Sequence, residues 1–228
     1  MDNDMLHVDI EKTANDYYVE DAYKTLRTNV LFCGDENQVL AITSCTPDEG
    51  KSTTSFELAV SLAEAGKNVL FIDADLRKSV IIGRLKIKGA KKGFTHYLSG
   101  QSPISEVIYE TNIQRLYVIL AGPVPPNPTE LLGGKHFKAL IPELRKVYDY
   151  IIIDTPPLGS VIDCAIIAKE CDGAIMVIEN RKVSHKFAKK VKDQLSKVGL
   201  PLLGVIMNKV NITDKRYYSK YYAAYGKK

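Results

Sequence analysis

Six short apolar runs, separated by stretches with helical periodicity, constrain the fold of this chain more than any other feature. Runs of this kind are typical of strands that are buried on both faces of a parallel sheet. Their alternation with helices predicts an α/β fold, with a mostly parallel central sheet flanked by helices on both faces. The predicted strands are residues 39–43, 69–72, 116–120, 150–153, 174–178 and 202–207.

Two apolar stripes at helical spacing predict helices after the first and the fifth of these strands, and each stripe ends at a glycine. A further helix is predicted at about residues 18–33, before the first strand. The two stripes are Phe56, Ala59, Val60 and Ala63, closed by Gly66, and Phe187, Ala188, Val191, Leu195 and Val198, closed by Gly199.

The net charge of +4 lies at the C-terminal end. Of 31 Lys and Arg and 27 Asp and Glu, residues 212–228 hold five and one, which leaves 26 of each sign elsewhere. Because residues 1–211 carry no net charge, no nucleic-acid partner is expected. No repeat or linker divides the chain, so we predict one domain at 1–211 and a flexible basic tail at 212–228.

Nothing in the sequence suggests a membrane span, a secretion signal or a structural metal. No apolar run approaches the roughly 18 residues that a spanning helix needs, and no signal-peptide pattern opens the chain. The four cysteines lack zinc-like spacing. We therefore expect a cytoplasmic protein with reduced thiols.

Residues 45–53 read CTPDEGKST, directly between the first predicted strand and the predicted helix that contains Phe56. Such a loop wraps backbone N–H groups around a triphosphate at a helix N-terminus. Gly50 permits close approach of the backbone, Lys51 supplies a cation for the β- and γ-phosphates, and the Ser52 hydroxyl can ligate Mg²⁺. The pattern predicts a Mg-ATP site whose loop contacts come from Thr46, Pro47, Asp48, Glu49, Gly50, Lys51, Ser52 and Thr53.

Two further strands end in acidic residues at the same edge of the sheet. The segments VLFIDADLRK and YDYIIIDTPP place Asp73 and Asp75 after one strand and Asp154 after another. Asp154 fits the Walker B role, which is to bind Mg²⁺ directly or through water. One of the three carboxylates is then free to accept a proton from an attacking hydroxyl.

Near the last predicted strand, residues 205–210 read VIMNKV, which bears on the choice of nucleotide base. Guanine-specific P-loop proteins follow Asn-Lys with an aspartate two residues later, and here that position is Asn211. Asn208 can still contact a purine, but the carboxylate that would bind the guanine edge is missing. ATP is therefore the expected nucleotide.

The C-terminal segment YYSKYYAAY places five of the chain's 13 tyrosines within nine residues. Exposed tyrosine clusters promote aggregation unless they have a use. They could pack on a partner or stack on bases, but we favour phosphoacceptors, since each phosphate would change the tail charge by about −1.5 to −2. The predicted acceptors are Tyr217, Tyr218, Tyr221, Tyr222 and Tyr225.

These motifs together resemble the bacterial tyrosine kinases, and most closely the stand-alone kinases of Gram-positive capsule and exopolysaccharide operons. The segment PVPPNPTELL at 123–132, with Asn127 as a helix cap, also resembles that family. The resemblance implies a P-loop fold of the MinD/ParA-like type and ATP-dependent phosphorylation of tail tyrosines between subunits. It implies catalytic roles for Lys51, Asp73, Asp75 and Asp154. We favour Asp73 as the base and Asp75 as an aid to Mg²⁺, although the two could exchange roles.

The same resemblance implies partners. They are an activating membrane-embedded regulator of polysaccharide chain length, a phosphotyrosine phosphatase, and other copies of the chain in a ring. The regulator would recruit the kinase to the inner face of the cell membrane. The family's ring motif appears here as Asp21, Lys24 and Arg27, in which a shorter acid and a lysine replace the usual Glu and Arg.

Two other functions compete with the kinase. A MinD/ParA-like switch ATPase would share all three aspartates, but such proteins carry a second lysine early in the loop, where this chain has Thr46, and lack a tyrosine tail. A nucleotide-gated, non-enzymatic scaffold would use the tail as a docking peptide.

Overall fold

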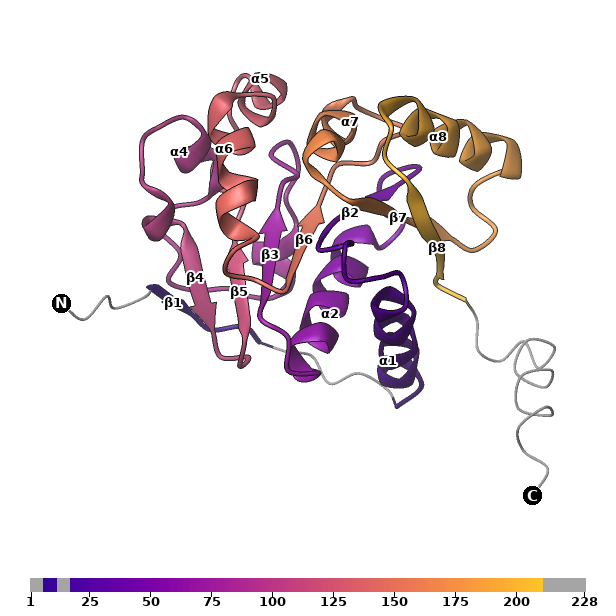
Figure 1. Cartoon of the computed structure of the whole chain (residues 1–228), viewed down its shortest axis with the longest axis horizontal. Coiled ribbons are helices and arrows are strands. Elements are labelled where there is room, and N and C mark those ends of the chain that lie inside the picture. The colour runs from indigo at the N-terminus through magenta and orange to yellow at the C-terminus, as the bar shows by residue number, and fades with distance from the viewer. Residues whose placement is uncertain (1–5, 12–16, 211–228) are drawn as a thin grey trace.

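The computed structural model describes residues 6–11 and 17–210, and it contains the predicted sheet. Within these described residues, eight strands lie in the order β1-β4-β5-β3-β6-β2-β7-β8, and every neighbouring pair is parallel except β4 and β5 (Figure 1). The strands are β1 (Leu6–Val8), β2 (Val39–Ser44), β3 (Val69–Asp73), β4 (Ile108–Thr111), β5 (Leu116–Ile119), β6 (Tyr150–Asp154), β7 (Gly173–Glu179) and β8 (Leu202–Asn208). The mostly parallel α/β fold is confirmed.

Helices cover both faces of this sheet, as predicted. The helices α1 and α2 pack on one face, and α4, α6, α7 and α8 pack on the other (Figure 1). Helices α2 and α8 are followed by the predicted glycines, Gly66 and Gly199. The helices are α1 (Tyr17–Leu31), α2 (Lys51–Glu64), α3 (Ile81–Arg84), α4 (Phe94–Leu98), α5 (Pro128–Leu132), α6 (Lys135–Leu144), α7 (Asp163–Ile167) and α8 (His185–Val198), with 3-10 turns at Ile104–Glu106 and Ala168–Glu170.

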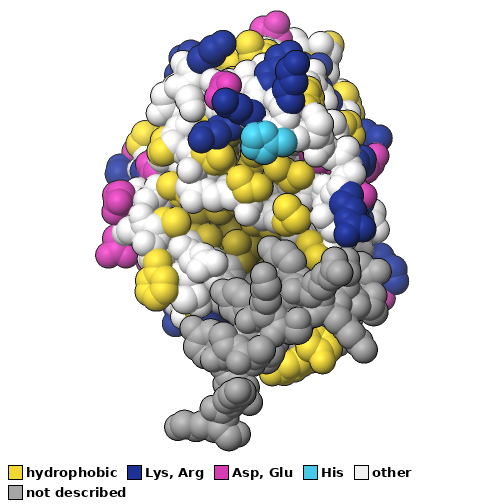
Figure 2. All heavy atoms as spheres, turned by 90° about the vertical axis from the view of Figure 1, so that its right-hand side faces the viewer, with side chains coloured by type: hydrophobic (Ala, Val, Ile, Leu, Met, Phe, Trp, Pro, Cys, Tyr) yellow, Lys and Arg dark blue, Asp and Glu magenta, His cyan; other side chains and the backbone are white. Residues whose placement is uncertain are grey.

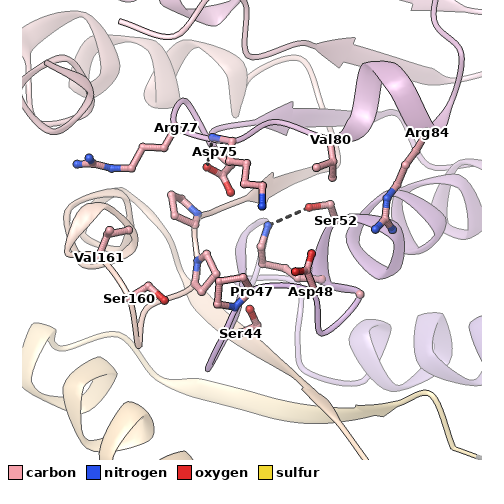
Figure 3. A pocket seen from close by; sticks show the side chains of 15 residues that line it. Ser44, Pro47, Asp48, Ser52, Asp75, Arg77, Val80, Arg84, Ser160 and Val161 are labelled. Carbon is pink, nitrogen blue, oxygen red and sulfur yellow. Dashed lines mark hydrogen bonds between the residues drawn. The ribbon is translucent and has the colours of Figure 1, made fainter. Parts of the chain in front are cut away.

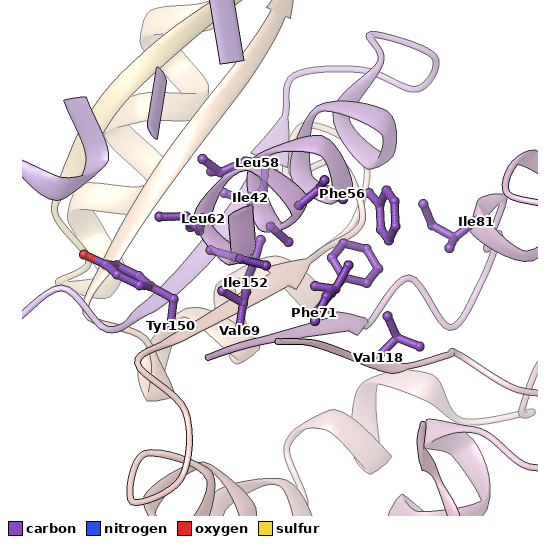
Figure 4. Packing of buried hydrophobic residues seen from close by; sticks show 14 of the residues in the cluster. Ile42, Phe56, Leu58, Leu62, Val69, Phe71, Ile81, Val118, Tyr150 and Ile152 are labelled. Carbon is purple, nitrogen blue, oxygen red and sulfur yellow. The ribbon is translucent and has the colours of Figure 1, made fainter. Parts of the chain in front are cut away.

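Side chains of each central strand alternate between the two layers of the core. In β3, Val69 and Phe71 face α2, whereas Leu70 and Ile72 face the layer that contains α4 and α6. Phe71 meets Phe56 of α2 edge-to-face, with ring centroids 5.4 Å apart (Figure 4). Burial on both faces explains why these strands appear in the sequence as continuous apolar runs.

All six predicted strands are present, but two others were missed. The strand β1 has three residues, and β4 reads IYET, in which buried and half-buried residues alternate. Neither segment contains a continuous apolar run, because both strands lie towards one edge of the sheet. The predicted N-terminal helix is α1, but it follows β1 and therefore does not precede the first strand.

The opposite edge of the sheet is β8, which exposes apolar side chains. Val205 and Met207 are 50% and 56% exposed. Figure 2 views the molecule from this side and shows hydrophobic side chains gathered there. Exposed apolar surface of this kind is a feature of contacts with other proteins. The tail at 212–228, with its five predicted acceptor tyrosines, lies outside the described residues.

The packing under α2 predicts that two Phe→Ala substitutions differ greatly in their effect on the free energy of unfolding. Phe71→Ala should reduce the free energy of unfolding by about 3–5 kcal/mol, because it removes a fully buried ring and leaves a cavity. Phe32→Ala, at a position that is 84% exposed, should change it by less than about 0.5 kcal/mol. Urea denaturation of both variants measures the contrast, and equal losses would contradict the described packing.

Candidate active site

A pocket lies at the carboxyl ends of β2, β3 and β6, which is where open α/β sheets bind ligands. Figure 3 shows three segments converging on it, namely the loop before α2, the segment after β3 and the segment after β6. The first segment, together with the end of β2 and the start of α2, contributes Ser44, Pro47, Asp48, Gly50, Lys51 and Ser52. The second contributes Asp75, Arg77, Lys78, Val80 and Arg84, and the third contributes Pro156, Pro157, Ser160 and Val161.

The loop before α2 has two residues in the left-handed backbone region, Asp48 at φ 64° and Gly50 at φ 85°. A Cβ at Gly50 would lie 2.1 Å from Nδ2 of Asn208, so this position favours glycine both for its backbone angle and for space. Aspartate, the residue at position 48, is one of the few residue types that adopt the left-handed conformation without a large penalty.

Lys51, which lines the pocket, forms a buried ion pair with Asp154, which lies behind the pocket lining. Lys51 Nζ lies 2.6 Å from Asp154 Oδ1 and 3.1 Å from Ser52 Oγ, and Ser55 Oγ donates to the same carboxylate oxygen at 3.1 Å. The other oxygen, Asp154 Oδ2, is buried and has no hydrogen-bond partner among the described residues. A carboxylate oxygen without a donor, close to a serine hydroxyl, fits the oxygen ligands of a hard divalent cation.

Asp73 and Asp75 occupy different depths. Asp73 is fully buried beside Asp154 on the neighbouring strand, and it accepts hydrogen bonds from Ser79 Oγ and the Asp75 N–H. Burial, reinforced by the negative charge of Asp154, raises the pKa of Asp73 to about 7. Asp75 lines the pocket itself, and its Oδ1 accepts the Lys78 N–H at 3.0 Å. A carboxyl with a pKa near 7 suits a general base.

A second polar cluster holds the far wall of the pocket, and the sequence did not reveal it. Arg77 donates two hydrogen bonds to the buried Asp163, at 2.6 and 3.1 Å, and Thr129 Oγ1 donates a third at 2.7 Å. Burial raises the pKa of Asp163, but these hydrogen bonds and the Arg77 charge outweigh it and lower the pKa. The cluster ties the segment after β3 to α5 and α7. Asn127 occupies the N-cap position of α5, but its side chain makes no capping hydrogen bond, contrary to the prediction.

Four of the predicted nucleotide contacts lie outside the pocket lining: Thr46, Glu49, Thr53 and Asn208. Thr53 is exposed and accepts a hydrogen bond from Arg84. Glu49 is buried under the loop, where its carboxylate accepts the backbone N–H groups of Thr46 and Glu179. Asn208 Nδ2 donates to the Glu49 carbonyl at 3.0 Å. Glu49 and Asn208 therefore brace the loop, and their contact with a nucleotide stays a prediction.

The predicted ring motif lies on α1. Asp21 and Lys24 are exposed, whereas Arg27 is half-buried and its Nη1 donates to the Ser61 carbonyl of α2 at 3.0 Å. Arg27 thus contributes to holding α1 on the domain, and the ring stays a prediction. No helix among the described residues has the length and apolar content that crossing a membrane requires.

The loop that joins β2 to α2, with the first residue of α2 a lysine paired to the aspartate at the end of β6, has the arrangement of a P-loop phosphate site. Residues 37–200 match a family model described as an AAA domain. The septum site-determining protein MinD of Pyrococcus horikoshii, solved with Mg-ADP, has the same fold (TM-score 0.67, 26% identity, 78% of this chain and 72% of that one). The chain is thus a nucleotide-binding P-loop protein.

Relatives with higher sequence identity show which family of P-loop proteins the chain belongs to. The chain is 47% identical over 209 residues to the tyrosine-protein kinase CpsD of Streptococcus agalactiae, a match that covers 92% of this chain and 90% of that one. The kinase domain of the Escherichia coli tyrosine kinase ETK is similar at a TM-score of 0.80 and 31% identity, over 88% of this chain and 82% of that one. The chain therefore belongs to the bacterial tyrosine-protein kinases.

The raised pKa of Asp73 predicts how stability depends on pH without metal or nucleotide. Between the unfolded pKa of about 4 and the folded pKa of about 7, the folded state binds the extra proton, so stability falls as pH rises through this window. Asp73→Asn removes the titration. It should therefore stabilise the protein at pH 8, by up to about 4 kcal/mol, and much less at pH 5.

Urea denaturation in EDTA at the two pH values measures this difference. Asp193→Asn, on the exposed side of α8, is the matched control and should behave as wild type at both pH values. An Asp73→Asn protein that gains the same stability at pH 5 and pH 8 would show that Asp73 does not titrate in this window.

Proposed function

We propose that this protein transfers the γ-phosphoryl group of Mg-ATP to tyrosine hydroxyls, and that the main acceptors are the tail tyrosines of other copies. The observation that carries the proposal is the juxtaposition of Lys51, Asp154 and Asp73 at one sheet edge, where a phosphate-binding cation, a cation-binding carboxylate and a group with a pKa of about 7 meet. A switch ATPase would share these three groups, with water in place of the tyrosine hydroxyl, so the tail tyrosines are what distinguish the two functions.

The residues of the candidate site divide the reaction between them. Lys51 exchanges Asp154 for the β- and γ-phosphate oxygens when the nucleotide binds. Ser52, Asp75 and Asp154 would hold Mg²⁺, which neutralises charge on the phosphates. The tyrosine oxygen forms a bond to the γ-phosphorus as the bond to the β,γ-bridging oxygen breaks. ADP leaves, and the tyrosine proton goes to Asp73.

Asp73 is fully buried, and its carboxylate accepts a hydrogen bond from the Ser79 hydroxyl. This hydrogen bond must break before Asp73 can reach the hydroxyl of the acceptor tyrosine. Catalytic hydrogen bonds often form only in the substrate complex, so this burial is compatible with a base. Asp75, on the pocket wall, is the alternative base.

The proposed partners follow from the family. A membrane-embedded regulator of capsular or exopolysaccharide chain length would recruit the kinase to the inner face of the membrane and activate it. Asp21 and Lys24 are exposed and therefore available for a ring of copies, and a phosphatase would reset the tail. The exposed apolar edge of β8 offers additional surface to a protein partner.

The proposal predicts stepwise mass gain. Purified protein with Mg-ATP, with and without the cytoplasmic peptide of its membrane partner, should gain up to five phosphates, one for each tail tyrosine. Lys51→Met should reduce the rate about a hundredfold or more, since it removes the cation at the transferred group. Lys51→Met protein should still gain phosphate from added wild type if transfer occurs between copies.

Intact mass and free phosphate, recorded together, separate the competing functions. Replacing Tyr217, Tyr218, Tyr221, Tyr222 and Tyr225 with Phe should abolish the mass gain without loss of nucleotide binding. Phosphate release without mass gain would indicate a switch ATPase. A nucleotide-bound protein that shows neither product, even with the partner peptide, would indicate a scaffold.

A further inference from the structure

Side chains from outside the phosphate loop (residues 45–53) donate hydrogen bonds to its backbone carbonyls. Three consecutive carbonyl oxygens accept donors from the ends of β7 and β8. Lys182 Nζ donates to Pro47 O at 3.4 Å, Lys209 Nζ donates to Asp48 O at 2.7 Å, and Asn208 Nδ2 donates to Glu49 O at 3.0 Å.

The direction of these carbonyls sets the direction of the neighbouring N–H groups. In a trans peptide, the carbonyl of one residue and the N–H of the next point to opposite sides of the chain, and no peptide bond in the described chain is cis. Fixing the carbonyls of residues 47, 48 and 49 outwards therefore turns the N–H groups of Asp48, Glu49 and Gly50 inwards. These are the groups that a phosphate-binding loop presents to its ligand.

A single carboxylate organises both lysines. Glu179 Oε2 lies 3.0 Å from Nζ of Lys182 and 3.0 Å from Nζ of Lys209, and the Glu179 N–H donates to Glu49 Oε1 at 3.3 Å. Hydrogen bonds from Lys209 and Lys182 lower the pKa of Glu179, so it stays ionised and holds the two ammonium groups over the loop. Lysine is otherwise a long side chain with many rotamers, and this carboxylate limits them.

We propose that Lys182 and Lys209, held by Glu179, are positioning residues for nucleotide binding. They orient the loop peptides and polarise them, because a cation on a carbonyl strengthens the N–H donor at the other side of the same peptide. The inference rests on the proposed function only in that the loop binds a nucleoside phosphate. It adds that affinity depends on two lysines that do not line the pocket.

If the two lysines served only to stabilise the fold, their removal should lower the melting temperature. A positioning role predicts weaker nucleotide binding with little change in melting temperature. Their side chains are 41% and 49% exposed, and exposed ion pairs add little to folding stability. Removing either lysine should therefore leave the melting temperature almost unchanged. A loop whose amides are no longer aligned should nevertheless bind phosphates less tightly.

The test is the dissociation constant for Mg-ADP, measured by calorimetry, since ADP binds without phosphoryl transfer. Lys209→Met should raise Kd about tenfold, and Lys182→Met should raise it less, because its contact with the loop is longer. Lys209→Arg keeps a charged donor and should restore Kd to within about twofold of wild type. The melting temperature of each variant without nucleotide should shift by less than about 2 °C.

Lys146→Met is the matched control, because this exposed lysine pairs with Glu143 on α6 and should leave Kd unchanged. Glu179→Gln combined with Lys209→Met should cost less than the two single changes together, since they act through one contact. If Lys209→Met binds Mg-ADP as tightly as wild type, or loses affinity only in proportion to a fall in melting temperature, the inference is wrong. Wild-type protein that fails to bind Mg-ADP would instead overturn the nucleotide site itself, and this inference with it.

Discussion

The buried ion pair between Lys51 and Asp154 is the interaction on which the site depends. Removing two charges from water costs more than their attraction returns unless the geometry is good, so such a pair is seldom a source of stability. Here it neutralises a carboxylate that lies next to another buried acid, Asp73. If a nucleotide drew Lys51 away, Asp154 would be left charged among buried groups. A metal ion would then have to replace the lysine, and we therefore expect nucleotide and Mg²⁺ to bind together.

The central part of the fold could be predicted because its strands are buried on both faces. Such strands must be apolar at every position, and so they appear directly in the sequence. Their carboxyl ends also share one edge, which is why Asp73, Asp75 and Asp154 could be assigned to a single site. This argument does not apply to the short strands β1 and β4. In β4, Tyr109 and Thr111 are buried, but Ile108 and Glu110 are only partly buried. Short strands near an edge are set by tertiary pairing, which local sequence does not reveal.

Within the site, the sequence predicted which residues are present better than where they point. Motif spacing could place Lys51 near the acids, since Lys51 begins the helix after a parallel strand and its Nζ lies 2.6 Å from Asp154. Side-chain direction in the preceding loop depends on turn dihedrals and on distant contacts. Glu49 turns under the loop because β7 offers it a backbone N–H, 130 residues away in the sequence. Arg77 and Asp163 are likewise 86 residues apart, and no local pattern links them.

The anchoring of the loop by β7 and β8 also explains how the loop tolerates Asp48. A side chain in the left-handed region costs roughly 1 kcal/mol, and a free loop would relax to escape it. The carbonyl of Asp48 is held by Lys209, and the next peptide is held by Asn208, which fills the space that a side chain at position 50 would need. The conformation therefore persists because the surrounding strands determine it. A loop kept open in this way meets a phosphate with its amides already aligned, and so little ordering is left to oppose binding.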